Sequence, residues 1–135
     1  GGIAGTMIAH AMFALPILDL SMKARTGGAQ WFAEAVAAFG LIATILAGLR
    51  FERTSIPWLV GLYITAAYWF TASTSFANPA VAIARSLSNT FSGIRPQDLP
   101  GFIAAELSGA VLALLFVNWL LREATDRTTH FEAKR

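Results

Sequence analysis

The sequence has 135 residues, of which 56% are hydrophobic and 13% are charged, and its mean hydropathy is +0.57. Because a soluble domain usually carries about 25% charged residues, this composition indicates a membrane protein that lies in a lipid bilayer. The formal net charge of +2 is too small to suggest nucleic-acid binding, and the lack of cysteine excludes disulfides and thiolate metal sites.

Four apolar segments follow one another along the chain, at 1–17, 29–49, 56–71 and 99–121. The segment 29–49 is long enough for a helix to cross roughly 30 Å of hydrocarbon. The third and fourth segments carry Pro57 and Pro100 near their starts, where a first helical turn tolerates proline. The first segment is short, as a helix cut at its N-terminal end would be. All four are expected to be helices, so the fold class is all-α.

The stretch 72–90 fits neither a membrane span nor an ordinary loop. It is small and semi-polar as far as Ala77, and Asn78-Pro79-Ala80 then begins a short apolar helix. Asn is a favoured N-cap, and proline at the first helical position loses no hydrogen bond. Eight to ten helical residues cross only about 12–15 Å, roughly half a bilayer.

A short helix that begins at membrane depth has a distinct chemistry. Its irregular backbone must be buried in protein or against a water-filled cavity. Its N-terminus carries a partial positive charge, which repels cations and protons and offers donors to water or a polar solute. The stretch 72–90 therefore predicts a re-entrant half-helix that lines a pore.

Charges outside the apolar segments predict the orientation in the membrane. Four basic residues fall on one side of the expected membrane, namely Lys23, Arg25, Arg85 and Arg95. Six fall on the other, namely Arg50, Arg53, Arg122, Arg127, Lys134 and Arg135. The positive-inside rule therefore places the charged tail 123–135 in the cytoplasm.

The triplet Asn78-Pro79-Ala80 resembles the second asparagine-proline-alanine motif of the aquaporin/aquaglyceroporin (major intrinsic protein) family, and the bacterial branch fits best. The resemblance covers nearly the whole chain. It implies an aquaporin-like right-handed bundle of tilted transmembrane helices with one re-entrant half-helix, which is the second half of an inverted repeat. Residues 1–122 would form this half-domain, with the end of the third span at 1–17, the fourth at 29–49, the fifth at 56–71 and the sixth at 99–121. The first half is absent, so we expect a fragment; the family also implies a homotetramer.

Two departures from the family pattern concern selectivity. The family has an arginine directly after the motif, where this sequence has Val81, and the matching aromatic or histidine position on the fifth span falls at Ala66. The resemblance therefore implies a constriction that is wider and less positive than in a strict water channel. Arg85 lies one helical turn beyond Val81, so it either lines the outer vestibule or is an ordinary interfacial arginine.

Glu34 and Glu106 are ionisable residues within apolar segments, which makes them functional candidates. They either relay protons or brace the re-entrant loop by accepting hydrogen bonds from its amides, and the family places such a bracing glutamate near the start of the fourth span. His10 either lines the pore or packs as a hydrogen-bonded histidine. With no cysteine and two distant histidines, nothing assembles into a catalytic or metal site, and no cofactor is expected.

The resemblance implies a passive channel in the cell membrane for water and small uncharged solutes such as glycerol, extending to metalloid hydroxides or organoarsenicals. Asn78, the 77–81 backbone, Ala66 and Val81 would line the pore. Two alternatives stay open at this point. One is a proton-coupled secondary transporter that uses the intramembrane glutamates, and the other is an inactive structural fragment that lacks half of the pore wall.

Overall fold

The computed structural model describes residues 1–132, with side chains for residues 1–122. The backbone forms five α-helices, namely α1 (Gly2–Met12), α2 (Gly28–Phe51), α3 (Ile56–Phe70), α4 (Pro79–Arg85) and α5 (Leu99–Glu132). Two single 3-10 turns precede α3 and α5, namely η1 (Arg53–Ser55) and η2 (Pro96–Asp98). Residues 1–132 contain no strand, and one isolated bridge joins Asp19 to Ser88. The expectation of a helical protein is confirmed.

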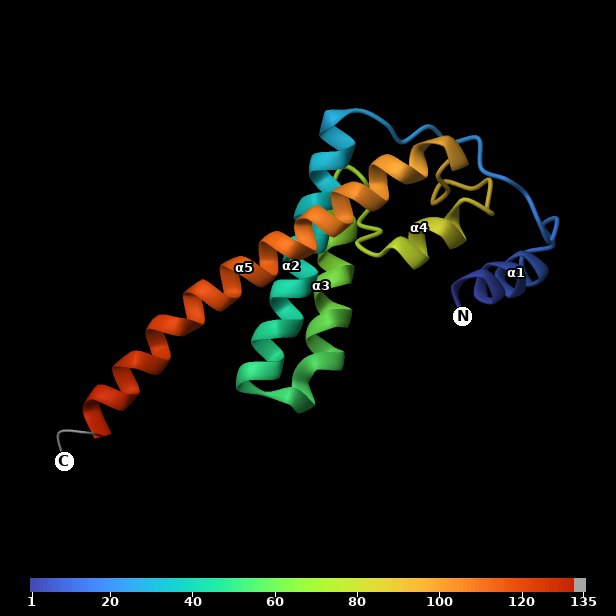
Figure 1. Cartoon of the computed structure of the whole chain (residues 1–135). Coiled ribbons are helices and arrows are strands. Elements are labelled where there is room, and N and C mark those ends of the chain that lie inside the picture. Colours follow the sequence, from blue (N-terminus) through green and yellow to red (C-terminus); the bar gives the residue numbers. More distant parts are fainter. Residues whose placement is uncertain (133–135) are drawn as a thin grey trace.

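The helices α2 and α3 form an antiparallel pair that is joined by a short connection, and α5 crosses α2 obliquely (Figure 1). The most extensive packing is between α2 and α5. It depends on Gly109, because a Cβ atom at this position would collide with the backbone carbonyl of Ala35. Such close approach through a glycine is typical of helices that pack without a side chain between them.

Among the described residues, two helices are long and apolar enough to cross a membrane, within Gly28–Phe51 and Pro96–Arg122. They correspond to the expected spans 29–49 and 99–121. The expected spans 1–17 and 56–71 are shorter helices, α1 with 11 residues and α3 with 15, so their role as spans stays a prediction. Much of α5 is apolar and exposed, including Leu112, Leu115 and Trp119, as a surface that faces lipid or a further helix would be.

Two expected boundaries differ from the structure. The helix α1 ends at Met12 instead of continuing to 17, because Ala14 has a positive φ of 55° and Pro16 disfavours a helical conformation for the residue before it. At the other end, α5 passes the expected limit of 121 and continues to Glu132, so the first part of the predicted tail has a helical backbone. The side chains of that part, and residues 133–135, lie outside the described residues.

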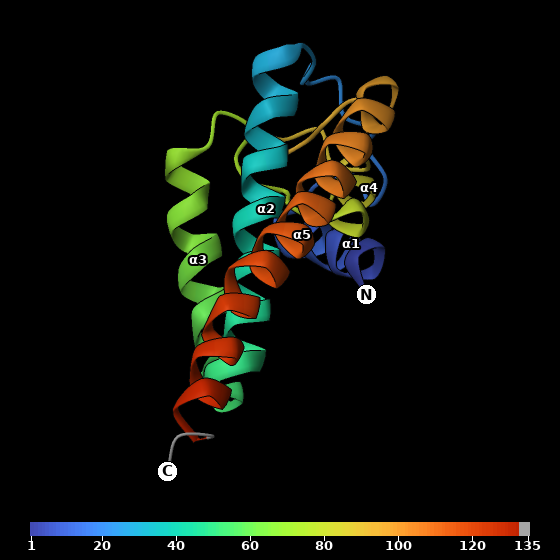
Figure 2. The same ribbon diagram turned by 60° about the vertical axis from the view of Figure 1, so that its left-hand side comes forward.

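The small helix α4 lies to one side of the α2–α3 pair, together with α1 (Figures 1 and 2). Both views place α4 within the height of α2, beyond neither of its ends. The chain therefore turns back into the bundle after α3, and this segment meets the buried core at Phe76, Ala82, Ile94 and Phe102. The rings of Phe76 and Phe102 lie 5.3 Å apart between centroids.

Candidate functional site

The segment 71–78, between α3 and α4, is irregular and nevertheless buried. Ser73 is 0% exposed, and Ser75 and Phe76 are each 2% exposed. Thr74, Ser75 and Ala77 have positive φ angles of 66°, 49° and 55°, a left-handed conformation that costs a non-glycine residue roughly 1–2 kcal/mol. A buried backbone without helical hydrogen bonds needs other partners for its N–H and C=O groups.

Two carboxylates supply partners for three successive N–H groups. Glu34, on α2, is 0% exposed; its Oε1 accepts from the N–H of Phe76 at 2.9 Å and its Oε2 from Ala77 at 2.8 Å. Glu106, on α5, is 1% exposed, and its Oε1 accepts from the N–H of Asn78 at 3.2 Å. The second oxygen of Glu106 has no hydrogen-bond partner among the described residues. These contacts are the ones that a bracing role requires.

Asn78 ends the irregular segment and caps α4. Its backbone is extended, its Oδ1 accepts from the N–H of Ala80 at 2.9 Å, and Pro79 takes the first helical position. The carbonyl of Asn78 accepts from the N–H groups of Val81 and Ala82 at 2.9 and 3.0 Å. The side chain is exposed. Because a capping asparagine uses its oxygen, its two amide N–H donors stay available to a solute.

A buried arginine holds the carbonyl groups around the segment. Arg25, in the connection between α1 and α2, is 4% exposed. Its Nε, Nη1 and Nη2 donate to the carbonyls of Gly93, Ser73 and Phe91 at 2.7, 2.8 and 2.9 Å. Its guanidinium also lies over the ring of Phe76, 5.1 Å from the centroid. One side chain therefore joins the start of the segment to the chain that follows α4.

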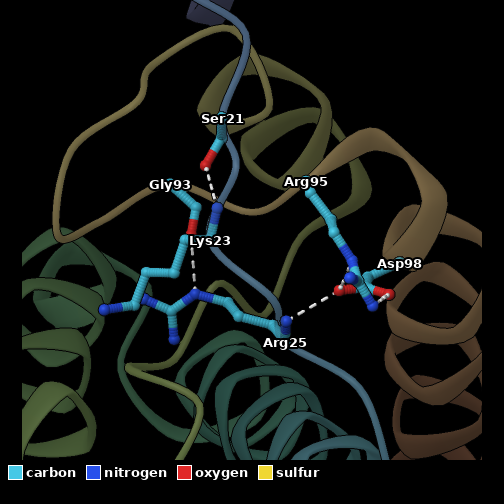
Figure 3. Close-up of polar contacts among 6 residues, drawn as sticks. All are labelled: Ser21, Lys23, Arg25, Gly93, Arg95 and Asp98. Carbon is cyan, nitrogen blue, oxygen red and sulfur yellow. Dashed lines mark hydrogen bonds and ion pairs between the residues drawn. The ribbon is translucent and has the colours of Figure 1, made fainter.

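The backbone N–H of Arg25 also has a partner (Figure 3). Its N–H donates to Oδ2 of Asp98 at 2.7 Å, and the same carboxylate pairs with Nε of Arg95 at 3.0 Å. Nearby, the N–H of Arg95 donates to the carbonyl of Lys23 at 2.9 Å. Burial, and then the charge of Arg85, lower the pKa of Arg25 below its ordinary value, but an arginine stays charged at neutral pH.

A cavity of about 350 Å³ lies between α1 and α4. Val81 and Arg85 border it from α4, and Thr6 and His10 border it from α1. The guanidinium of Arg85 lies 4.4 Å from the ring centroid of Phe76 and 5.8 Å from that of Tyr68. Its buried Nη1 has no hydrogen-bond partner among the described residues. Aromatic faces, not acceptor atoms, hold this cation.

His10 is 3% exposed and anchors a row of hydroxyl groups at the edge of the same cavity. Its Nε2 lies 2.9 Å from Oγ of Ser88, and the hydroxyls of Thr90 and Ser92 continue the row at 3.1 and 3.0 Å. His10 is thus a hydrogen-bonded packing residue that also borders a cavity, and its place in a pore stays a prediction. Across residues 1–122, no three His, Asp or Glu side chains lie close enough to hold a metal ion.

Comparison with known proteins finds a strong similarity to an aquaglyceroporin. The chain is 74% identical to the aquaglyceroporin AqpS of Rhizobium meliloti (strain 1021) over 124 residues, which are 92% of this chain. The chain belongs to the major intrinsic protein family. It spans about half the length of this relative, since the match covers 53% of it. No family model matches the chain, and no solved structure matches it.

The residues that the sequence analysis compared with major intrinsic proteins do not all come together. Asn78, Glu34 and Glu106 meet at one point, and Val81 and Arg85 share one cavity. Ala66, by contrast, is exposed on α3 and is not among the described residues that border the Val81 cavity. Its role in a selectivity filter stays a prediction.

The sequence analysis missed Arg25 as a site residue and counted it only as a loop charge. Its three acceptors are backbone carbonyls at 73, 91 and 93, which leave no mark in the sequence. The one available signal was that no acidic residue lies within four positions of Arg25, so the arginine has no local ion-pair partner in the sequence. The nearest acidic residue on its N-terminal side is Asp19. In this member of the family the arginine binds carbonyls instead.

Proposed function

We propose that this chain forms the second half of a passive membrane channel for water and small uncharged solutes. The observation that carries the proposal is the arrangement around Asn78. Its N–H is held by Glu106, its side-chain oxygen caps α4, and its amide donors stay free for a solute. The 74% identity to an aquaglyceroporin supports the same function.

In this proposal the fold is the aquaporin-like right-handed bundle, with α4 as the re-entrant half-helix. The seven residues of α4 suit a helix that ends within the bilayer. The helices α1, α2, α3 and α5 would then be the end of the third span and the fourth, fifth and sixth spans. Since the relative is about twice as long as the matched part, the other half of the pore wall would come from residues outside this chain.

The proposed pore selects by size and by charge. Asn78 donates hydrogen bonds to a solute oxygen, and the N-terminal end of α4 opposes protons and other cations. Val81 and Ala66 leave the filter wider than an arginine and an aromatic residue would, and Arg85 lines the vestibule. The solutes we propose are glycerol and related polyols, with metalloid hydroxides and organoarsenicals as larger members of the same neutral class.

The surroundings of the channel follow from the same family assignment. We propose a multi-pass protein of the cell membrane, with a cytoplasmic C-terminus and a homotetrameric assembly. The orientation rests on the excess of basic residues in the 50–56 connection and the tail. No enzymatic activity is proposed, because passive diffusion through a pore needs no covalent chemistry.

The test is osmotic flux through vesicles that contain the complete protein. Wild type is expected to pass water, glycerol and four- to five-carbon polyols, and flux should rise linearly with concentration. The variant Val81→Arg should still pass water and lose most of the flux of the larger polyols. Wild-type flux no faster than that of empty vesicles contradicts the proposal. Saturable flux that requires a proton gradient would favour the transporter alternative.

A further inference from the structure

The position that follows the asparagine-proline-alanine triplet carries no charge in this chain, so the proposed pore lacks a cation barrier at Val81. The cavity that Val81 borders is nevertheless charged. Arg85 is the only Lys, Arg, Asp or Glu among the described residues that line it. Because Val81 and Arg85 lie four positions apart on α4, they occupy one face of the helix, with Arg85 one turn further from Asn78.

The charge of Arg85 is not cancelled by an ion pair. Within residues 1–122, neither Arg85 nor Arg25 forms a salt bridge. The carboxylate of Glu34 acts on both guanidiniums, but its oxygens accept from the N–H groups of Phe76 and Ala77. Arg85 therefore lies at the cavity wall without a directly paired carboxylate among the described residues, and Glu34 acts on its charge only from a distance.

Aromatic rings hold Arg85 in this place. The guanidinium of Arg85 lies 4.4 Å from the ring centroid of Phe76, and that of Arg25 lies 5.1 Å from the same centroid. Two cations therefore contact one aromatic ring. Phe76 is itself fixed against Phe102. An aromatic face attracts a guanidinium without neutralising it, whereas a carboxylate would. The arrangement positions two like charges next to each other and keeps both effective.

We infer that Arg85, held by Tyr68 and Phe76, excludes inorganic cations from this pore in place of an arginine at position 81. The inference rests on the proposed function. In this arrangement two residues perform separate tasks. Val81 leaves the pore wide enough for neutral solutes, and Arg85, one helical turn away, repels cations. A charge at the wall of a low-dielectric cavity focuses its field into the opening, so a single residue is sufficient for this role.

The experiment measures the ratio of K⁺ leak to glycerol flux in vesicles that contain the complete protein. Arg85→Leu should raise this ratio about tenfold or more, and Arg85→Lys should keep it low because the charge remains. Adding Val81→Arg to Arg85→Leu should restore the low ratio. The matched control is Arg53→Leu, an exposed arginine in the α2–α3 connection, which should leave the ratio unchanged.

The outcomes separate the inference from the proposed function. Wild-type vesicles that pass no glycerol overturn the proposed function, and the inference with it. If wild type passes glycerol and Arg85→Leu stays as tight to K⁺ as wild type, the inference alone is wrong. Should Arg85→Leu fail to insert, Arg85→Gln removes the charge and keeps a polar side chain, and an unchanged ratio in that variant overturns the inference equally.

Discussion

The segment 71–78 has two supports of opposite charge, and they work differently. Glu34 and Glu106 project from two long helices and accept from three successive N–H groups. Arg25 projects from an irregular connection and donates to carbonyls at three separate places. A contiguous row of donors needs only two carboxylates, whereas scattered acceptors suit the rigid fork of a guanidinium. The anionic support thus fixes the segment to the helices, and the cationic support fixes the loops to one another.

The largest effect is expected from breaking the anionic support at Glu34. Glu34→Ala leaves the N–H groups of Phe76 and Ala77 buried and unpaired, which should cost about 3–5 kcal/mol. Thermal unfolding of the detergent-purified protein measures the loss. Glu52→Ala, which removes an exposed carboxylate at the far end of α2, is the control. A loss at Glu34 no greater than at Glu52 would contradict the bracing role.

The cationic support should be the next most sensitive. Arg25→Lys keeps the charge and provides a single ammonium in place of the fork, so at least one of the three carbonyls loses its donor. We expect a loss of about 2–3 kcal/mol in stability and faster hydrogen exchange of the 86–98 amides. Lys23→Met, at an exposed position nearby, serves as the control. Equal exchange in Arg25→Lys and wild type would show that the fork is dispensable.

Removing the helix cap tests the end of the segment that both supports position. Asn78→Ala removes the acceptor for the N–H of Ala80, and loss of such a cap typically costs about 1 kcal/mol. Asn78→Asp keeps an acceptor oxygen and should recover most of that stability. It replaces the amide donors, however, so polyol flux should stay low. Recovery of flux by Asn78→Asp would mean that the amide donors do not serve the solute.

Glu106→Gln should have a much smaller effect than any change at Glu34. Only one of its oxygens accepts a hydrogen bond, at 3.2 Å, and an amide oxygen can replace it. The loss should be about 0.5 kcal/mol or less, with glycerol flux retained. Loss of flux in this variant with the fold intact would contradict the bracing role and favour a proton relay.

The smallest effect on stability is expected at Glu52, whose carboxylate is exposed to solvent. The hydroxyl and N–H of Thr54 both donate to Glu52, the hydroxyl more strongly, and they lower the pKa of Glu52. Thr54→Ala should raise that pKa towards its ordinary value. A carboxylate whose pKa is lowered in the folded state stabilises the fold at pH values above that pKa, and this stabilisation is lost as the pH falls through it. Thr54→Ala should therefore lower the stability of the fold slightly at neutral pH and leave it unchanged at low pH. Side-chain NMR titration of Glu52 measures the shift, and an unchanged pKa would contradict it.

The sequence predicted those parts of the site that depend on residue type and local order. An asparagine before a proline predicts a helix start, and the family resemblance pointed to a brace at Glu34. The left-handed conformations of Thr74, Ser75 and Ala77 could not be predicted, because glycine is the usual sign of such a backbone. Their cost is met by contacts with residues distant in sequence, which no local pattern records.

The end of α5 shows a different limit. The apolar run stops at 121, and hydropathy alone predicts that the helix ends there. Backbone helix continues to Glu132 because residues such as Arg122, Glu123 and Ala124 favour helix in water as well as in lipid. Hydropathy therefore indicates where an apolar environment gives way to water, whereas helix propensity indicates where the helix itself ends.

The bond between Asn78 and Glu106 has a consequence for the order of assembly. Synthesis delivers the chain from its N-terminus, so Arg25 and Glu34 precede the segment that they hold, and Glu106 follows it. Until α5 has emerged and packed against α2, the N–H of Asn78 has no acceptor from this carboxylate. The backbone around Asn78 is therefore among the last parts of the site to reach its final conformation. A nascent chain stalled before residue 106 would lack the acceptor for the N–H of Asn78.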